Sequence, residues 1–282
     1  MRVLLRSYVS SRSTSRISRS IGLRVRSLLQ GRSPSRCSAI TNKLLTRRRF
    51  AVSCSVAIIG VGLVGKQVVN QLTSPALGRL FNVISLSNSK HTVSITPSAS
   101  SVDGATLLSL LPPSSAPLPS SSTQPGVSYS PANPAELVKK LAAEARSNKT
   151  HTILVDCTSD LSVTELYPLA ISSGLSVVTP NKKGFSSADS LWQQILEAQS
   201  APGAGLVYLE ATVGAGLPII STLRDLLKTG DEVTKVEGVL SGTLSYIFNE
   251  FSKPGGSGSA GPKFSEIVKI AKENGYTVSY LS

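Results

Sequence analysis

The chain has 282 residues, enough for one large domain or two small ones, and 40% of them are hydrophobic. Its formal net charge of +13 arises in residues 1–50, which hold twelve Arg, one Lys and no acidic residue, while sixteen basic and sixteen acidic residues balance in the rest. A neutral body argues against a nucleic-acid-binding protein. No apolar run reaches the roughly 18 residues that span a bilayer, which argues against a membrane protein.

The segment 1–50 is rich in Arg and Ser and lacks Asp and Glu, which is typical of an organellar presequence. We expect cleavage near Arg49 or Phe50 and therefore a mitochondrial protein. A disordered basic arm, or translated sequence upstream of the true start, would give the same composition, and the protein would then be cytoplasmic. This segment is left out of the fold prediction.

The sequence from Ser55 reads SVAIIGVGLVGKQVVNQL, which predicts a buried strand, a glycine turn and an amphipathic helix. A second strand follows at about residues 81–86. Ser and Pro dominate residues 97–134, and such a composition does not sustain a helix or a central strand. We expect this stretch to form a surface insertion.

Strands and helices alternate in the next part of the chain. The successive segments are AELVKKLAAEARS (helix, from Ala135), HTILVDCTS (strand), about 163–172 (helix, stopped by Gly174), SVVTP (strand), SLWQQILEAQ (helix) and LVYLEATVG (strand, from Leu206). Strands separated by helices predict an α/β fold with a parallel sheet and right-handed crossovers, which is the doubly wound architecture. We assign residues 51–209 to this domain and residues 210–282 to a second one.

Gly60, Gly62 and Gly65 form a GxGxxG motif between the first strand and the first helix. In that context Gly60 permits the tight turn, Gly62 lets the backbone approach a pyrophosphate at the helix N-terminus, and Gly65 allows the helix to pack closely on the strand. The motif predicts a Rossmann NAD(P)-binding domain. A tight structural turn without a ligand is the alternative.

No acidic residue lies between Ala51 and Val102, although NAD-specific sites place a carboxylate after the second strand to bind the ribose 2′-hydroxyl. The second strand instead leads into SLSNSKH, which contains Lys90. The cation and hydroxyls of this segment would tolerate the 2′-phosphate of NADP. The sequence therefore favours NADP as the cofactor, with NAD as the other possibility. Lys90 as a solvated loop lysine is the plainer interpretation.

The Cys and His residues are few and scattered. Only His91 and His151 are present, so no Cys/His cluster for zinc can be assembled. Cys157 follows a strand and would suit the nucleophile of a semialdehyde dehydrogenase, a different dehydrogenase class. No His is placed to activate it, and a structural Cys is the favoured interpretation.

Several segments resemble homoserine dehydrogenase, and in particular its stand-alone fungal type. They are the glycine turn, VDCTS, TPNKKGFSS and YLEATVGAGLPIISTLRDLLKTGDEVTKVEGVLSGTLSYIFNEF. The resemblance covers about residues 52–277 and implies reversible reduction of L-aspartate 4-semialdehyde to L-homoserine with NADPH or NADH, on the route to threonine and methionine. It also implies a set of cofactor contacts, namely Gly60, Val61, Gly62, Leu63, Val64, Thr158 and Lys182. Lys182 as an ordinary surface lysine is the alternative.

Members of this family bind a monovalent cation, usually sodium, in the turn that matches EATVGAGL. The resemblance assigns its ligands to the Glu210 carboxylate and to the main-chain carbonyls of Val213, Ala215 and Leu217. Oxygen ligands suit a hard cation. The alternative is that Glu210 only caps the following helix by accepting main-chain NH bonds.

The resemblance implies that an incomplete α+β substrate and dimerisation domain follows the NAD(P)-binding domain, with a homodimer as the state of the full-length family member. We expect SGTLSYIFNEF to form a half-buried strand that runs into a helix, with its aromatic residues in a core. Tyr246 is a packing residue in this interpretation, and a role as proton donor has little support.

The family signature begins in FSEIVKIAKENGYT, where Ala271, Gly275, Tyr276 and Thr277 match and Gly275 falls in the substrate site. The next residue in the family is a substrate-binding Glu, but Val278 stands here, and the family's later Asp and proton-donating Lys have no counterpart. We therefore assign no catalytic residue and expect a truncated, nearly inactive chain. A genuine non-catalytic NADP-binding form is the alternative.

Overall fold

A seven-stranded sheet organises the protein. The computed structural model describes residues 54–96, 103–120, 124–252, 262–274 and 276. Both the basic N-terminal segment and Gly275 lie outside these residues. The strands are β1 (Cys54–Ile59), β2 (Phe81–Ser87), β3 (His91–Ile95), β4 (Val127–Pro131), β5 (Thr152–Asp156), β6 (Ser176–Val178) and β7 (Val207–Tyr208).

The spatial order of the strands is β4-β3-β2-β1-β5-β6-β7. The five strands β2, β1, β5, β6 and β7 run parallel, as predicted. β3 and β4 were not predicted as strands, and each pairs antiparallel with its neighbour. Only residues 88–90 connect β2 to β3, and so short a turn joins antiparallel strands only, since a parallel pair needs a long crossover.

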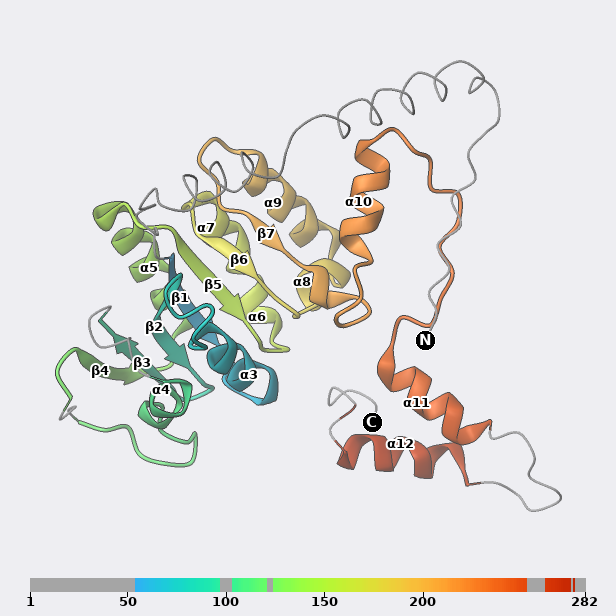
Figure 1. The fold of residues 1–282 in the computed structure, drawn as a ribbon, viewed down its shortest axis with the longest axis horizontal. Coiled ribbons are helices and arrows are strands. Elements are labelled where there is room, and N and C mark those ends of the chain that lie inside the picture. The colour runs from blue at the N-terminus through green and yellow to red at the C-terminus, as the bar shows by residue number, and fades with distance from the viewer. Residues whose placement is uncertain (1–53, 97–102, 121–123, 253–261, 275, 277–282) are drawn as a thin grey trace, which may run out of the picture.

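Helices cover both faces of the sheet, which confirms the doubly wound architecture (Figure 1). In chain order they are α3 (Leu63–Leu72), α4 (Gly104–Leu110), α5 (Pro134–Asn148), α6 (Leu161–Thr164), α7 (Tyr167–Ser172), α8 (Lys183–Ser186), α9 (Asp189–Ser200), the 3-10 helix η2 (Glu210–Thr212), α10 (Ile220–Lys228), α11 (Gly242–Phe251) and α12 (Phe264–Glu273).

The first strand explains how the two faces are filled. In β1, Ala57 and Ile59 face the core formed with α5, α7 and α9, whereas Val56 and Ile58 face the core formed with α3 and α4. All four are at most 3% exposed. A strand buried on both faces needs a continuous apolar run, and CSVAII supplies one.

The described part of the Ser- and Pro-rich stretch contains a helix that was not predicted. The expectation that residues 97–134 hold neither helix nor central strand is wrong for α4, whose Leu107 and Leu110 are buried in the core. Asp103 begins this helix, because its carboxylate accepts from the backbone N–H groups of Ala105 and Thr106. β4 is an edge strand, the position where Pro131 is tolerated.

Two other predicted elements differ. The helix expected at 163–172 divides into α6 and α7, because Pro168 stands in the first turn of α7 and lacks the N–H that a continuous helix needs. The strand expected within SGTLSYIFNEF, residues 241–251, is not formed, because residues 242–251 are helix α11 throughout. There, Ser241 caps α11 by accepting from the backbone N–H of Leu244 at 3.2 Å.

The C-terminal helices stand apart from the sheet. α11 and α12 lie side by side, and the stretch 231–241 joins them to α10 (Figure 1). Ile247, Ile267 and Ala271 form their small shared core. On α11, Phe248 and Phe251 are 53% and 51% exposed, so these helices leave apolar surface uncovered.

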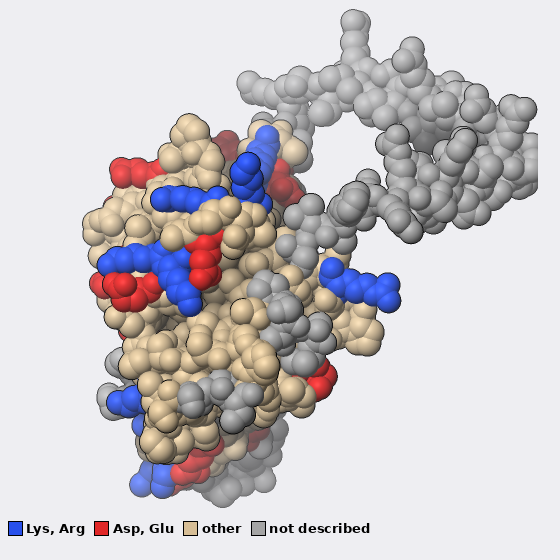
Figure 2. Space-filling view, turned by 90° about the vertical axis from the view of Figure 1, so that its left-hand side faces the viewer, with Lys and Arg blue, Asp and Glu red and all other residues tan. Residues whose placement is uncertain are grey.

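Charged side chains of both signs are interspersed on the face of the sheet domain shown in Figure 2. On α5, Lys139 pairs with Glu136 and Lys140 pairs with Glu144. No helix in the described part of the chain is both long and apolar enough to cross a membrane.

Leu107 tests whether the Ser- and Pro-rich stretch belongs to the core. We expect Leu107→Ala to lower the free energy of unfolding by about 2–5 kcal/mol, because it removes a fully buried side chain. Urea denaturation measures the effect. Leu118→Ala is the control, since Leu118 is 36% exposed and should change stability little. Equal effects of the two changes would contradict the placement of α4.

Candidate functional site

The glycine turn after β1 packs against the backbone that follows β5. Gly60 has a φ of +89°, which favours glycine, and a Cβ there would lie 2.7 Å from Thr158 Cγ2 and 2.8 Å from the Cys157 carbonyl carbon. Those separations are too short for a side chain of any kind. The turn and the β5 loop are therefore in direct contact at the carboxyl edge of the sheet.

The remaining glycines of the motif differ in what surrounds them. A Cβ on Gly65 would overlap the carbonyl oxygen of Gly60, so α3 starts close against the turn. A Cβ on Gly62 meets nothing within 4 Å. Gly62 is the N-cap of α3 and provides no side-chain cap, while Leu63 and Val64 beside it are 82% and 53% exposed. Open space at a bare helix N-terminus suits an anion.

A buried carboxylate that the sequence analysis did not single out lies under the loops beside this turn. Asp156 ends β5 with no exposed surface. Its Oδ1 accepts from the Thr158 backbone N–H at 2.7 Å. Its Oδ2 accepts from the Tyr167 hydroxyl at 2.6 Å and from Asn181 Nδ2 at 3.0 Å. The sequence signal was the polar residue type at the last position of an otherwise apolar strand.

Asn181 connects the loop after β6 to the loop after β5. Its side-chain amide also reaches Thr158 Oγ1 at 3.3 Å and the Asp160 carbonyl at 2.9 Å. Its Oδ1 accepts from the backbone N–H of Lys183, at the start of α8. The next residue, Lys182, is exposed. Thr158 and Lys182 thus project from two loops that share one buried network.

The connection between β2 and β3 has a fixed shape. Asn88 Oδ1 accepts from the backbone N–H groups of Lys90 at 2.9 Å and His91 at 2.8 Å, and Asn88 Nδ2 donates to the Pro112 carbonyl. Ser89 and Lys90 are exposed at the tip, where Ser89 bonds to the Ser114 hydroxyl. The tip therefore presents a hydroxyl and a cation.

The turn after β7 is held by Glu210. One carboxylate oxygen accepts from the backbone N–H of Ile220 at 3.0 Å and the other from that of Ser221 at 2.8 Å. Glu210 therefore caps α10, the alternative role set out from the sequence. Gly214 and Ala215 follow with φ values of +68° and +53°, so the chain reverses between Glu210 and the helix.

Cys157 lies between Asp156 and Thr158 and is partly buried. Burial raises the pKa of its thiol to about 11, and the adjacent Asp156 carboxylate contributes to the rise. A thiol with so high a pKa is protonated near neutral pH and is a poor nucleophile. This environment supports the structural interpretation of Cys157.

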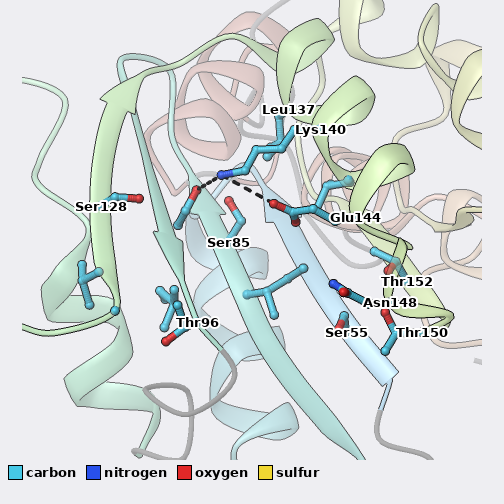
Figure 3. A pocket seen from close by; sticks show the side chains of 16 residues that line it. Ser55, Ser85, Thr96, Ser128, Leu137, Lys140, Glu144, Asn148, Thr150 and Thr152 are labelled. Carbon is cyan, nitrogen blue, oxygen red and sulfur yellow. Dashed lines mark hydrogen bonds and ion pairs between the residues drawn. The ribbon is translucent and has the colours of Figure 1, made fainter. Parts of the chain in front are cut away.

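A hollow lies at the end of the sheet opposite the glycine turn. It is a cavity of about 450 Å³ between the sheet and α5 (Figure 3). Ser55 and Thr152 line it near the starts of β1 and β5, and Lys140 reaches across it to Ser94 Oγ at 3.3 Å. The glycine turn is at the other ends of these strands, so the cavity is separate from the site at the carboxyl edge.

Comparison with known proteins gives one consistent result. Residues 60–209 match the family model described as the NAD-binding domain of homoserine dehydrogenase, and residues 218–279 match the homoserine dehydrogenase model. The chain is 46% identical over 228 residues to homoserine dehydrogenase of Emericella nidulans and 38% identical over 223 residues to that of Saccharomyces cerevisiae. Each alignment covers 79% of this chain and 56% of the relative. The chain thus spans about half the length of these curated relatives.

Solved structures agree with that result. A Candida auris protein of unknown function is 42% identical, with a TM-score of 0.58 over 80% of this chain and 57% of that one. A hyperthermophilic archaeal homoserine dehydrogenase mutant in complex with NADPH has a TM-score of 0.58 over 81% of this chain and 63% of that one. At 24% identity, the archaeal protein shows a shared fold.

The raised pKa of Cys157 predicts a pH profile for alkylation. In a Cys37→Ser/Cys54→Ser variant, we expect the iodoacetamide rate to rise about tenfold per pH unit until the pH nears the thiol pKa of about 11. Mass spectrometry measures the rate. The same variant in denaturant should level off near the free-thiol pKa of about 8.5. A folded-state profile that levels off below pH 9 would contradict the assigned environment.

Proposed function

This chain belongs to the homoserine dehydrogenase family, and on that premise we propose that its sheet domain binds NADP(H) across the carboxyl edge of the sheet. The observation that carries the proposal is the open space at Gly62, on the N-terminus of α3. Pyrophosphates bind at this position in doubly wound domains because the helix N-terminus attracts negative charge and a glycine admits the ligand.

The cofactor contacts follow from this placement. Gly60, Gly62 and the exposed residues Leu63 and Val64 surround the pyrophosphate position, with Val61 between them packed on the core. Thr158 and Lys182 lie on the neighbouring loops, beyond the ends of β5 and β6. When bound, the reduced cofactor supplies a hydride to a carbonyl carbon. The residues of this chain bind and orient it.

NADP is the proposed cofactor in preference to NAD. The exposed tip between β2 and β3 carries Ser89 and Lys90 and no carboxylate. The tip follows the second strand, where the ribose 2′ position of a bound dinucleotide lies. A cation and a hydroxyl there attract a 2′-phosphate, which a carboxylate would repel.

The reaction we propose for the whole protein is the reduction of L-aspartate 4-semialdehyde to L-homoserine, a step toward threonine and methionine. The family membership supports it, because relatives at 46% and 38% identity carry the name homoserine dehydrogenase. We also propose a homodimer. The exposed apolar side chains of α11, including Leu244, Phe248 and Phe251, support a partner surface in this region.

We propose further that the turn from Glu210 to Leu217 holds a monovalent cation such as sodium. The Glu210 carboxylate and the carbonyls of Val213, Ala215 and Leu217 would be its oxygen ligands. The reversal of the chain at Gly214 and Ala215 supports the proposal, since a turn of this kind can direct successive carbonyls inward, toward one point. Each carboxylate oxygen that accepts one N–H bond from α10 keeps lone pairs for a cation.

Gly62 provides the test of cofactor binding. We expect the 282-residue chain to bind NADPH more tightly than NADH in isothermal titration calorimetry. Gly62→Ala should weaken NADPH binding about tenfold or more, because the methyl group occupies the path of the pyrophosphate. It should leave the melting temperature nearly unchanged, since the space around Gly62 is open.

The matched control is Gly65→Ala. A Cβ there overlaps the Gly60 carbonyl, so this change should lower the melting temperature. Absence of NADPH binding by the folded wild-type chain would contradict the proposed function. NADPH oxidation with aspartate 4-semialdehyde, measured on the same preparation, separates a chain that turns over from one that only binds cofactor.

Glu210 provides the test of the cation. The melting temperature of the wild-type chain should be higher in NaCl than in choline chloride of equal ionic strength, because sodium stabilises the folded turn by binding to it. Glu210→Gln should abolish that difference, since the amide lacks the charge but can still accept a bond from α10. A wild-type chain with equal melting temperatures in the two salts would leave Glu210 with its capping role alone.

A further inference from the structure

Two side chains, those of Thr179 and Asn181, join the loop after β6 to the end of β5 and its loop. Thr179 Oγ1 donates to the Asp156 carbonyl at 2.9 Å. Asn181 makes more of the contacts. It is 3% exposed and donates to Asp156 Oδ2 at 3.0 Å and to the Asp160 carbonyl at 2.9 Å. Its backbone N–H donates to Thr179 Oγ1 at 2.8 Å. Asn181 therefore links the loop after β6 to the loop after β5 while remaining too buried to contact a ligand itself.

The charge of Asp156 makes this link strong. A buried carboxylate is costly unless donors surround it, and bonds to a charged acceptor are stronger than neutral ones. The Asp156 carboxylate accepts from three residues that lie in different segments, namely Thr158, Tyr167 and Asn181. Thr158 and Asn181 are in the two loops, whereas Tyr167 belongs to α7, behind the sheet edge.

The loop after β5, which belongs to this network, also contacts the glycine turn directly. The Thr158 methyl group and the Cys157 carbonyl carbon occupy the space where a Gly60 side chain would stand. The Cys157 backbone N–H also donates to the Ile59 carbonyl at 2.8 Å. A displacement of the β5 loop would therefore be transmitted to the pyrophosphate turn or open a gap beside it.

The strand order assigns the two loops to one half of the cofactor. A dinucleotide lies across the sheet edge with its pyrophosphate at the first strand and the 2′ position of its adenosine ribose at the second. In this sheet β2 lies on one side of β1, and β5 and β6 lie on the other. The nicotinamide half therefore extends over the ends of β5 and β6.

We propose that Asn181, held by Asp156, is a positioning residue that sets the loops of Thr158 and Lys182 for the nicotinamide half of the cofactor. The inference rests on the proposed function and extends it, because it divides the site into two parts. The adenosine half depends on the glycine turn and the β2–β3 tip. The nicotinamide half depends on the buried link between two loops.

The test compares two ligands on two variants of the 282-residue chain. NADPH spans both halves, whereas 2′,5′-ADP carries the adenosine half without nicotinamide. Asn181→Ala should raise the dissociation constant of NADPH about tenfold, equivalent to ~1.4 kcal/mol, and that of 2′,5′-ADP less than about twofold. Isothermal titration calorimetry provides both constants.

The matched control is Tyr167→Phe. It removes a bond to the same oxygen of Asp156 and a bond to Thr179 Oγ1, both from α7. The Asn181 bonds to Asp156 and Asp160 stay, so both loops remain linked. Both variants should lower the melting temperature. Only Asn181→Ala should weaken the binding of NADPH more than that of 2′,5′-ADP. If Asn181→Ala does not fold, Asn181→Ser, which keeps a small polar group, replaces it in the same comparison.

Three results would overturn the inference. Asn181→Ala could weaken the binding of both ligands equally, which would make the network a general structural support. It could leave NADPH binding unchanged. Alternatively, Tyr167→Phe could weaken NADPH binding relative to 2′,5′-ADP binding as much as Asn181→Ala does. Failure of the wild-type chain to bind either ligand would instead refute the proposed function, so the two failures are distinguishable.

Discussion

A buried carboxylate at the end of β5 constrains the candidate site. Asp156 has no contact with solvent, so its oxygens need donors from the protein, and the nearest segments supply them. Hydrogen bonds to this carboxylate hold the Thr158 backbone, the side chain of Asn181 in the loop after β6, and the Tyr167 hydroxyl of α7. The loop fixed in this way then fills the space left by Gly60. Hence the protein's own contacts determine the shape of this edge of the sheet.

The sequence predicted the parts of the fold that depend on local pattern. The apolar run of β1, the GxGxxG turn and the parallel core strands were all predicted and confirmed. The Asp156 network was missed because Asp156 and Asn181 are 25 residues apart and meet only when β5 and β6 pair. The order of α4 was missed as well, since Leu107 gains its place from packing against α3 and not from the composition around it.

The C-terminal part illustrates how context decides structure. The imperfect alternation in SGTLSYIFNEF, residues 241–251, favours a strand running into a helix, yet residues 242–251 form helix α11. A strand gains its stability from neighbours, whereas α11 and α12 form their own hydrogen bonds and a small shared core. The chain spans about half the length of its curated relatives.

The most direct test of the central claim is a crystal structure of this chain with NADPH. The account predicts the pyrophosphate at the N-terminus of α3, beside Gly62, with the 2′-phosphate near Lys90 and the nicotinamide over the loops of Thr158 and Lys182. Those loops should keep the Asp156–Asn181 bond of 3.0 Å. NADPH bound instead in the cavity near Ser55, or a cofactor whose binding breaks that bond, would contradict the account.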